Sequence, residues 1–325
     1  MRSSVILSTG SYLPETVIFN EDLAQFPQRS LKLIAQKTGV TARRVAAEDQ
    51  CTSDLALNAA RLCLEKVAFP PDRIEGIIVS TSSPDRIQPA TATRVQNLLG
   101  ARRAFAFDIN SVCSGSTFGI SLADSLIRSG KHENILFIAA EVYSRILNKK
   151  DFSTFPFFGD GSGAILFGAD CSNRGVLHSC LRTDGDGSEV ICVPGGGTML
   201  PFEKMQDPRE AFFRMKGRSV FDFAVHRGSE IISCVLEEAG VMPEEIECFI
   251  CHQANINILE RVAANIGVSP EKFYVNLDRY GNTASASVPI ALDEAIAGGI
   301  ISTGDLVITV AFGGGLSWGA NLIRV

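Results

Sequence analysis

The amino-acid sequence predicts a layered α/β fold that is made of two similar halves. Short apolar runs with the composition of buried strands alternate with longer segments of helical periodicity, which is typical of helices packed on sheets. The same order of strand, small-residue helix, strand and glycine-rich reversal occurs twice along the 325 residues. With 46% hydrophobic and 20% charged residues, the chain has an ordinary globular composition and can bury a sizeable core.

Each strand and helix is predicted from a local pattern of residues. We expect the first strand within residues 1–15. A helix is predicted over residues 52–69, where capping-type residues at 52–54 precede apolar residues at three- and four-residue steps. Apolar runs predict five further strands, at residues 74–83, 104–110, 133–142, 246–255 and 305–315.

The repeat divides the chain into two predicted halves that meet near residues 168–175. In residues 1–170 a helix rich in small residues begins near Cys113, and in residues 171–325 the corresponding helix begins near Asn282. Few residues are identical between the halves, so this argument rests on the order of the features. Residues 183–217, which contain DGDG and PGGG, interrupt the second half and are predicted to form a surface insertion or a lid.

Charge and targeting patterns exclude several classes of protein. The formal net charge is -6, and no lysine- or arginine-rich run offers a binding surface for nucleic acid. The first residues lack the apolar segment of a secretory signal, and no apolar stretch reaches the roughly 20 residues that cross a bilayer. Nine scattered cysteines fit reduced thiols in a cytosol. We therefore expect a soluble, cytoplasmic protein with no nucleic-acid or membrane partner.

One pair of cysteines has the spacing of a metal or redox site. Cys248 and Cys251 are separated by two residues, and a histidine follows directly. However, the sequence contains no second C-x-x-C, and residues three apart on a strand point to opposite faces. The strand interpretation therefore argues against a metal site at this pair.

Cys113 is the first candidate for chemistry. It lies in SVCSGSTFG, between a predicted strand and the start of a predicted helix. The helix dipole and free N–H groups at such a position favour a thiolate and are expected to lower the pKa of the thiol. The small residues at 114–116 leave room for a substrate carbonyl. This pattern predicts a nucleophile, although a plain buried cysteine would fit it as well.

Two polar residues of the second half are candidates to act with this thiol. His252 ends a predicted buried strand, at the edge where side chains of α/β folds converge on ligands. Asn282 opens the small-residue helix of the second half, and the duplication places it opposite Cys113. A satisfied core histidine and a helix-capping asparagine are the structural alternatives. The coincidence of the three residues favours one shared site.

The glycine-rich segments GDGSGA and FGGGLSWGA fit neither the dinucleotide-binding nor the P-loop spacing. Tight turns are the structural explanation for both segments. The functional interpretation is that the backbone N–H of Gly314 joins the N–H of Cys113 to hold an oxyanion.

Together these motifs resemble those of the β-ketoacyl-acyl carrier protein synthase III enzymes of the thiolase superfamily. The similarity covers essentially the whole chain and includes VCSGSTFG, HQAN, YGNTASAS, FFGDGSGAILF and AFGGGLSWGA. It implies a thiolase-like αβαβα fold, a homodimer, and an acyltransferase of fatty-acid or related secondary-metabolite biosynthesis.

The resemblance also implies a role for each candidate residue. Cys113 would accept an acyl group from a thioester, carried on coenzyme A or on acyl carrier protein. His252 and Asn282 would donate hydrogen bonds to malonyl-acyl carrier protein as carbon dioxide leaves, and the carbanion equivalent would attack the acyl-cysteine. The N–H groups of Cys113 and Gly314 would hold the oxyanion, and Phe312 would shield the thiol. No metal or redox cofactor is implied.

Several positions depart from the family pattern around the expected thioester entrance. Leu33 and Lys37 replace a tryptophan and an arginine that clamp the adenine end of coenzyme A, and Phe152 replaces a second arginine. Asn257 replaces a basic residue that follows HQAN. Gln88 stands where an aromatic residue of the other subunit often closes the acyl pocket. These departures are compatible with a specialised relative of a secondary pathway.

Other functions are compatible with the same residues. An acyltransferase of this fold would pass the acyl group to an alcohol, amine or sugar without decarboxylation, but the retained Asn282 favours condensation. A cysteine hydrolase would use Cys113 and His252. A condensing subunit that has lost its activity would only bind a partner, but here the reactive positions are filled. Chalcone synthase-like enzymes close with G-F-G-P-G, whereas this chain reads FGGGLSWG.

Overall fold

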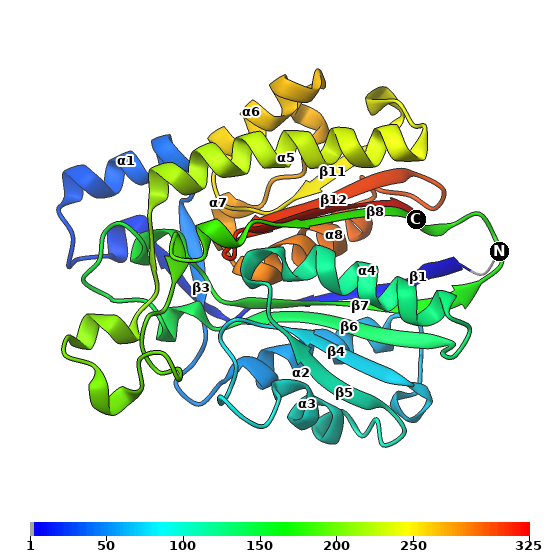
Figure 1. Cartoon of the computed structure of the whole chain (residues 1–325), viewed down its shortest axis with the longest axis horizontal. Helices are drawn as coiled ribbons and strands as arrows, with labels where there is room; N and C mark the ends of the chain where they lie inside the picture. Colours follow the sequence, from blue (N-terminus) through cyan, green and yellow to red (C-terminus); the bar gives the residue numbers. More distant parts are fainter. Residues whose placement is uncertain (1–2) are drawn as a thin grey trace.

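The computed structural model describes residues 3–325, in which two large sheets are stacked on each other (Figure 1). The first sheet has the order β1–β7–β6–β4–β5, and these strands are Ser3–Tyr12, Gly161–Asp170, Asn134–Glu141, Gly76–Ser80 and Phe105–Ile109. The second sheet has the order β11–β12–β13–β8, and these strands are Cys248–Cys251, Leu306–Gly313, Ser317–Arg324 and Gly175–Thr183. Short strands β2 and β3, Thr16–Phe19 and Ala42–Val45, pair apart from both sheets.

Helices occupy the space between the sheets and cover their two outer faces (Figure 1). The central layer consists of α4, Gly115–Arg128, and α8, Ser287–Ala297. The first sheet is covered by α2, Thr52–Glu65, and α3, Thr91–Leu99, and the second by α5, Gly217–Ala239, and α6, Ile256–Ile266. Helix α1, Gln28–Thr38, and the single turn α7, Leu277–Tyr280, lie at one end of the molecule. The five layers confirm the predicted αβαβα fold.

The two sheets repeat one arrangement of strands. In the first sheet β4 and β6 are parallel, and β7 and β1 continue the sheet with antiparallel pairing. In the second sheet β11 and β12 are parallel, and β13 and β8 continue it in the same way. The first sheet has one additional strand, β5, beside β4. The order of features in the sequence therefore corresponds to a repeat in three dimensions.

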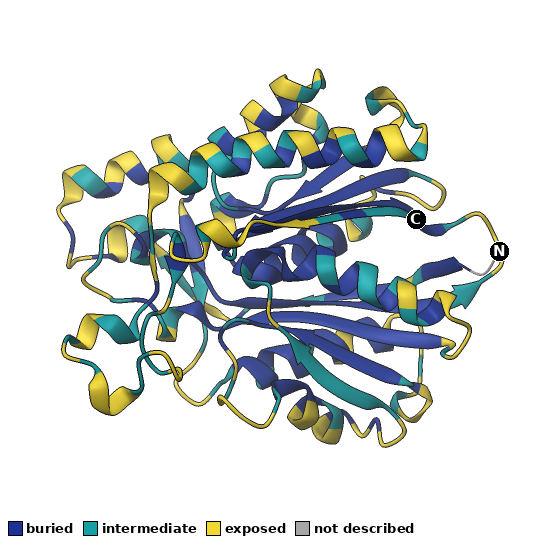
Figure 2. Cartoon of the chain, in the orientation of Figure 1, coloured by how far each residue is buried: buried dark blue, intermediate teal, exposed yellow. Residues whose placement is uncertain are grey.

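Helix α8 of the central layer is buried along most of its length, whereas α4 also has intermediate and exposed residues (Figure 2). Val288 and Leu292 of α8 share one apolar core with Phe137 of the first sheet and Val307 of the second, and all four side chains are fully buried. A helix covered on both faces is expected to be apolar around most of its circumference. Each such side chain contributes about 1.5–3 kcal/mol by leaving water. Packing of the central helices therefore requires both sheets.

Two local predictions need correction. Helix α2 begins at Thr52, but its N-cap is Cys51, whose backbone N–H donates to the Asp54 carboxylate over 2.9 Å. The residues between β8 and α5 form only the two-residue strands Ile191–Cys192 and Arg214–Met215 besides short turns. They are more than a surface insertion, because Ile191 and Phe213 are buried beside Cys113 in one apolar cluster.

None of the helices within residues 3–325 combines the length and the apolar character that crossing a bilayer requires.

Candidate active site

Cys113, His252 and Asn282 line one cavity of about 250 Å³ between the two halves. Their exposed fractions are 6%, 2% and 7%, so a reactant has to enter the protein to touch them. The rest of the wall is mostly apolar and includes Phe157, Phe158, Ile191, Phe213, Val220, Phe221, Ile258 and Phe312. The structure therefore brings together the three residues that are candidates from the sequence, in a pocket with a mostly apolar wall.

Cys113 is held in a sharp turn at the start of α4. Val112, directly before it, has a φ of 47°, a left-handed conformation that residues with a branched side chain rarely adopt. Strand β12 passes so close that a Cβ on Gly313 would lie 2.7 Å from the Cys113 nitrogen, so only glycine fits there. The turn thus places the thiol against the end of β12, at the floor of the cavity.

The expected lowering of the Cys113 pKa by its helix position is not found. Burial and the nearby Glu141 carboxyl raise the pKa of the thiol, whereas the N–H of Cys113 itself lowers it. The cause is the apolar, closed surroundings, which disfavour the charged thiolate. The cavity without a reactant therefore favours the neutral thiol.

The turn at Cys113 is repeated in the second half. Ala284 also has a φ of 47°, and the side-chain oxygen of Asn282 accepts from the Ala284 N–H over 2.8 Å. In the first half, Asn110 accepts in the same way from the Val112 N–H over 3.1 Å. Asn282 therefore corresponds to Asn110, rather than to Cys113 as the sequence suggested. Because its oxygen is engaged, the Asn282 side chain has its NH₂ group left to donate.

His252 follows β11 and is fixed at its backbone and at one ring nitrogen. Its N–H donates to the carbonyl of Val310 over 2.8 Å, and Nδ1 is 2.7 Å from Ser287 Oγ. The edge of the ring meets the Phe312 ring at a centroid distance of 5.5 Å. When the Ser287 hydroxyl donates to Nδ1, the proton of the neutral imidazole is on Nε2. No motif in the sequence points to Ser287, because only the fold brings α8 beside β11.

The buried position of His252 leads to a prediction about stability. Burial lowers the pKa of His252 to about 4, whereas an unfolded histidine has a pKa of about 6.5. The unfolded chain therefore binds a proton between these values that the folded chain does not, so stability falls as pH decreases through this window. The effect amounts to about 1.4 kcal/mol per pH unit. Urea unfolding near pH 7.5 and pH 5 should show a smaller loss for His252→Gln than for the unchanged chain. Equal losses would contradict this environment for His252.

Glu141 is a buried carboxyl group that sequence reasoning missed. It ends β6 and accepts hydrogen bonds from the Ser83 hydroxyl over 2.6 Å and from the Ser285 hydroxyl over 2.7 Å. Burial raises the pKa of this carboxyl, and the hydrogen bonds oppose the shift. Ser285 is the counterpart of Cys113 in the repeated turn. Glu141 therefore links the first half to the turn that carries Asn282.

A wider cavity of about 610 Å³ adjoins the first one. The two cavities share Thr38, Phe157, Phe221 and Asn255 as lining residues, so the wider one is the natural entrance. The predicted substrate-binding residues Lys37, Phe152 and Asn257 line it together with Leu33, as do two arginines that the sequence analysis did not select, Arg218 and Arg261. The entrance therefore has guanidinium groups at positions 218 and 261, whereas the family pattern has arginines at positions 37 and 152.

The remaining candidates from the sequence are Phe312, Gly314 and Gln88. Phe312 and Gly313 line the reactive cavity, and Gly314 is the next residue, where β12 gives way to a turn. Gln88 is exposed and is not among the residues that line either cavity. The role expected of Gln88, which is to close the acyl pocket of the other subunit, stays a prediction.

The C-x-x-C pair behaves as the strand interpretation predicted. Cys248 packs into the core between the sheets and Cys251 into the core beneath α5 and α6, so the two thiols lie on opposite faces of β11. They do not share a metal site.

The five layers, together with a thiol at the start of a central helix beside a histidine and an asparagine, define a protein of the thiolase-fold class. The family model for 3-oxoacyl-(acyl-carrier-protein) synthase III matches residues 107–185, and the model for its C-terminal part matches residues 236–325. The chain is 43% identical to the beta-ketoacyl-(acyl-carrier-protein) synthase III of Caldanaerobacter subterraneus subsp. tengcongensis, over 98% of this chain and 97% of that protein. The chain belongs to the 3-oxoacyl-(acyl-carrier-protein) synthase III family.

Solved structures agree with this assignment. The 3-oxoacyl-(acyl-carrier-protein) synthase III from Aquifex aeolicus superposes with a TM-score of 0.91 at 38% identity, covering 99% of this chain and 100% of that chain. A priming β-ketosynthase from the R1128 polyketide biosynthetic pathway superposes equally well, with a TM-score of 0.91 at 27% identity over 99% and 96% of the two chains. An enzyme named for a polyketide biosynthetic pathway therefore has the same fold as a 3-oxoacyl-(acyl-carrier-protein) synthase III.

Proposed function

We propose that this chain is an acyltransferase that condenses an acyl group, loaded on Cys113, with malonyl-acyl carrier protein by decarboxylative Claisen chemistry. The product is a 3-oxoacyl thioester of fatty-acid or related secondary-metabolite biosynthesis. The observation that carries the proposal is the convergence of a buried thiol and two neutral hydrogen-bond donors on one apolar cavity. Carbon dioxide release from malonyl thioester that depends on a loaded acyl group is the direct test.

In the first step the Cys113 sulfur attacks the carbonyl carbon of the acyl thioester. A new S–C bond forms, the bond to the carrier sulfur breaks, and the thiol proton ends on the departing carrier thiol. The backbone N–H groups of Cys113 and Gly314 hold the oxyanion of the tetrahedral intermediate. Since burial favours the neutral thiol, proton transfer accompanies the attack.

In the second step the malonyl thioester oxygen accepts hydrogen bonds from His252 Nε2 and the Asn282 NH₂ group. Carbon dioxide leaves, and negative charge develops on that oxygen next to the two donors. The enolate carbon then attacks the acyl carbonyl, a C–C bond forms, and the Cys113 sulfur leaves as a thiolate that takes up one proton from solvent. Burial keeps His252 neutral near pH 7, with the Nε2 proton maintained by the Ser287 hydroxyl. Each step uses groups of the chain and its two substrates, so the reaction requires no metal or redox cofactor.

The proposed assembly is a cytoplasmic homodimer that receives its second substrate from acyl carrier protein. Gln88 would then close the acyl pocket across the subunit boundary, and its amide would favour an acyl chain with a polar end. The chain has a formal net charge of -6. An acidic protein has no overall electrostatic attraction to nucleic acid or to an anionic membrane surface, so neither is supported as a partner.

The entrance leads to a prediction about the acyl donor. Leu33 provides no aromatic face on which adenine could stack. Lys37 lacks the planar guanidinium group of arginine, and Phe152 carries no charge. Each lost stacked or charged contact is worth about 1 kcal/mol, so two or three together weaken coenzyme A binding by about ten- to a hundredfold. We expect slow loading of Cys113 from acetyl-coenzyme A and faster loading from acyl carrier protein or from longer or polar acyl groups.

Single-turnover acylation with matched donors on coenzyme A and on carrier protein measures this preference. Leu33→Trp combined with Lys37→Arg should improve loading from acetyl-coenzyme A, whereas Leu33→Ile serves as a matched control. Rapid, saturable loading of the unchanged chain by micromolar acetyl-coenzyme A, ahead of every other donor, would contradict the prediction without affecting the proposed condensation.

A further inference from the structure

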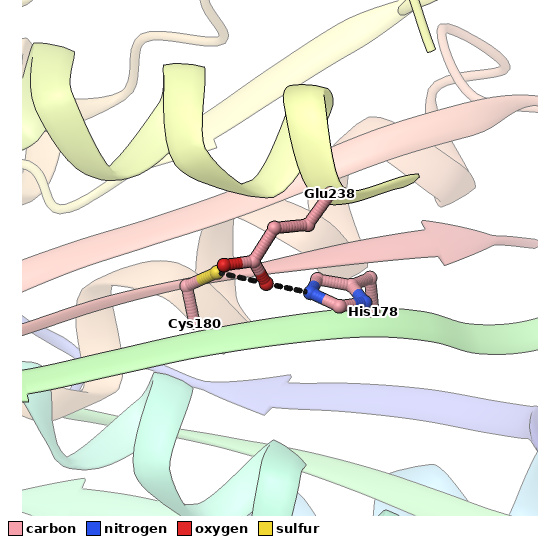
Figure 3. A group of neighbouring side chains, drawn as sticks. All are labelled: His178, Cys180 and Glu238. Atoms are coloured by element: carbon pink, nitrogen blue, oxygen red, sulfur yellow. Dashed lines mark hydrogen bonds and ion pairs between the residues drawn. The ribbon is translucent and has the colours of Figure 1, made fainter. Parts of the chain in front are cut away.

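A second group of reactive side chains lies outside the active site, between β8 and α5 (Figure 3). His178 and Cys180 are two residues apart on β8 and so share one face of the strand. Cys234 and Glu238 are four residues apart on α5 and so share one side of the helix. Figure 3 shows the Glu238 carboxylate reaching from the helix to both His178 and Cys180.

The ligand-forming atoms of these residues converge on one small volume. Those of His178, Cys180 and Glu238 all lie within 4.8 Å of one another. Cys234 Sγ is 3.2 Å from Cys180 Sγ and 3.4 Å from a carboxylate oxygen of Glu238. An imidazole nitrogen, a sulfur and a carboxylate therefore converge, and the sulfur of Cys234 adjoins them through Cys180 and Glu238.

We propose that His178, Cys180, Cys234 and Glu238 form a binding site for a thiophilic divalent cation, Zn²⁺ above all. Thiolate, imidazole and carboxylate are the ligands of zinc in tetrahedral protein sites. With Zn–S bonds of about 2.3 Å and Zn–N bonds of about 2.0 Å, neighbouring ligand atoms of a tetrahedron lie roughly 3.3–3.8 Å apart. The separations of 3.2 Å between the sulfurs and 3.4 Å from each sulfur to one oxygen of the carboxylate are close to this geometry. His178 Nε2, which is 2.5 Å from Glu238 Oε2, has to move away from the carboxylate to make room for the ion.

Access and charge also fit a bound cation. The side chains of His178 and Glu238 are 32% and 48% exposed, so an ion can enter from solvent, whereas Cys180 is buried behind them. Two thiolates and one carboxylate exceed the charge of a divalent ion by one unit. The Arg182 guanidinium, 3.9 Å from Cys234 Sγ, offsets that remaining negative charge.

The site would serve the scaffold rather than the reaction. Cys234 is 13 residues along α5 from Phe221, which lines both active-site cavities, and this corresponds to about 20 Å of helix. A metal at this position would fasten the C-terminal half of α5 to the second sheet. The helix that also carries Arg218 at the entrance would thereby be held in place.

Zinc binding to the full chain tests the proposal. Protein stripped with a chelator under reducing conditions should take up one Zn²⁺ per chain in competition with a chromophoric chelator. Co²⁺ in place of Zn²⁺ should produce the absorption band of a thiolate-to-metal charge transfer. Cys180→Ser and Cys234→Ser should each weaken the affinity by more than about tenfold, while condensation activity is retained.

Two further variants make the test specific. Cys192→Ser, at a half-buried cysteine outside the cluster, should bind zinc like the unchanged chain. Glu238→Gln, at an exposed ligand, should weaken binding with no effect on folding. Zinc uptake that survives all three ligand variants would overturn the proposal. A disulfide between Cys180 and Cys234, seen as a loss of two hydrogens by mass spectrometry with no zinc uptake after reduction, would overturn it as well.

Discussion

Replacing Cys113 with alanine is expected to abolish covalent labelling by every acyl thioester, because no other thiol faces the reactive cavity among its lining residues. Condensation should fall to background, since the acyl group no longer has a sulfur to carry it. The fold should persist, because Cys113→Ala removes one sulfur from an already open cavity wall. Intact-mass spectrometry after incubation with acyl thioester measures the adduct, and thermal unfolding measures the fold.

A matched control separates the nucleophile from the other cysteines. Cys171 is an exposed thiol remote from the cavity, and Cys171→Ala should acquire the acyl group at the normal rate. An adduct on the Cys113→Ala protein that peptide mapping assigns to a different cysteine would refute the assignment of the nucleophile.

Asn282→Ala is expected to load the acyl group normally and then to accumulate it when malonyl thioester is added. In the proposed mechanism the asparagine donates only in the second step, as charge develops on the malonyl oxygen, and loss of one such donor costs about 10²–10³-fold in rate. Quenched-flow measurement of the acyl-enzyme and of carbon dioxide release should show both effects. Slow acyl loading with an intact fold would place Asn282 in the first step instead.

Asn282→Asp distinguishes the donor from the turn. The carboxylate retains an oxygen that can accept the Ala284 N–H, which is the hydrogen bond that fixes the turn, but it has no N–H to offer the enolate. Asn282→Asp should therefore be at least as slow in condensation as Asn282→Ala, with a smaller loss of stability. Recovery of activity in the aspartate variant would show that the turn, rather than the donor, was the cause.

The buried strands could be predicted because apolar runs are local signals, whereas the αβαβα layers were implied by the resemblance to the family. The runs at residues 133–142 and 305–315 contain β6 and β12, and the repeated order of features corresponds to the similar strand order of the two sheets. The cap of α2 could not be predicted correctly. Cys51 is the N-cap, and the carboxylate of Asp54, the third residue of the helix, accepts a hydrogen bond from the Cys51 backbone N–H. The residues between β8 and α5 could not be placed, because burial of Phe213 depends on contacts distant in sequence.

That Cys113, His252 and Asn282 share one cavity could be predicted because each lies near an end of an element, in a distinctive motif. The residues that support these three could not be predicted from the sequence. Ser287 and Glu141 are ordinary polar residues in the sequence. Their importance arises only where α8 meets the end of β11 and where the turn that carries Ser285 meets β6. The pKa of Cys113 was predicted in the wrong direction, since local position suggests a helix dipole but gives no measure of the surrounding burial.

The burial of α4 and α8 between two sheets has a consequence for synthesis. Domains begin to fold from the N-terminus while the ribosome is still adding residues. Here the apolar side of α4, including Ile120 and Ile127, is completed by Ile323 of the last strand. The part of this surface that faces the second sheet stays open to solvent until β12 and β13 have been made. Truncated products that end before β12 should therefore aggregate rather than accumulate as folded half-enzymes.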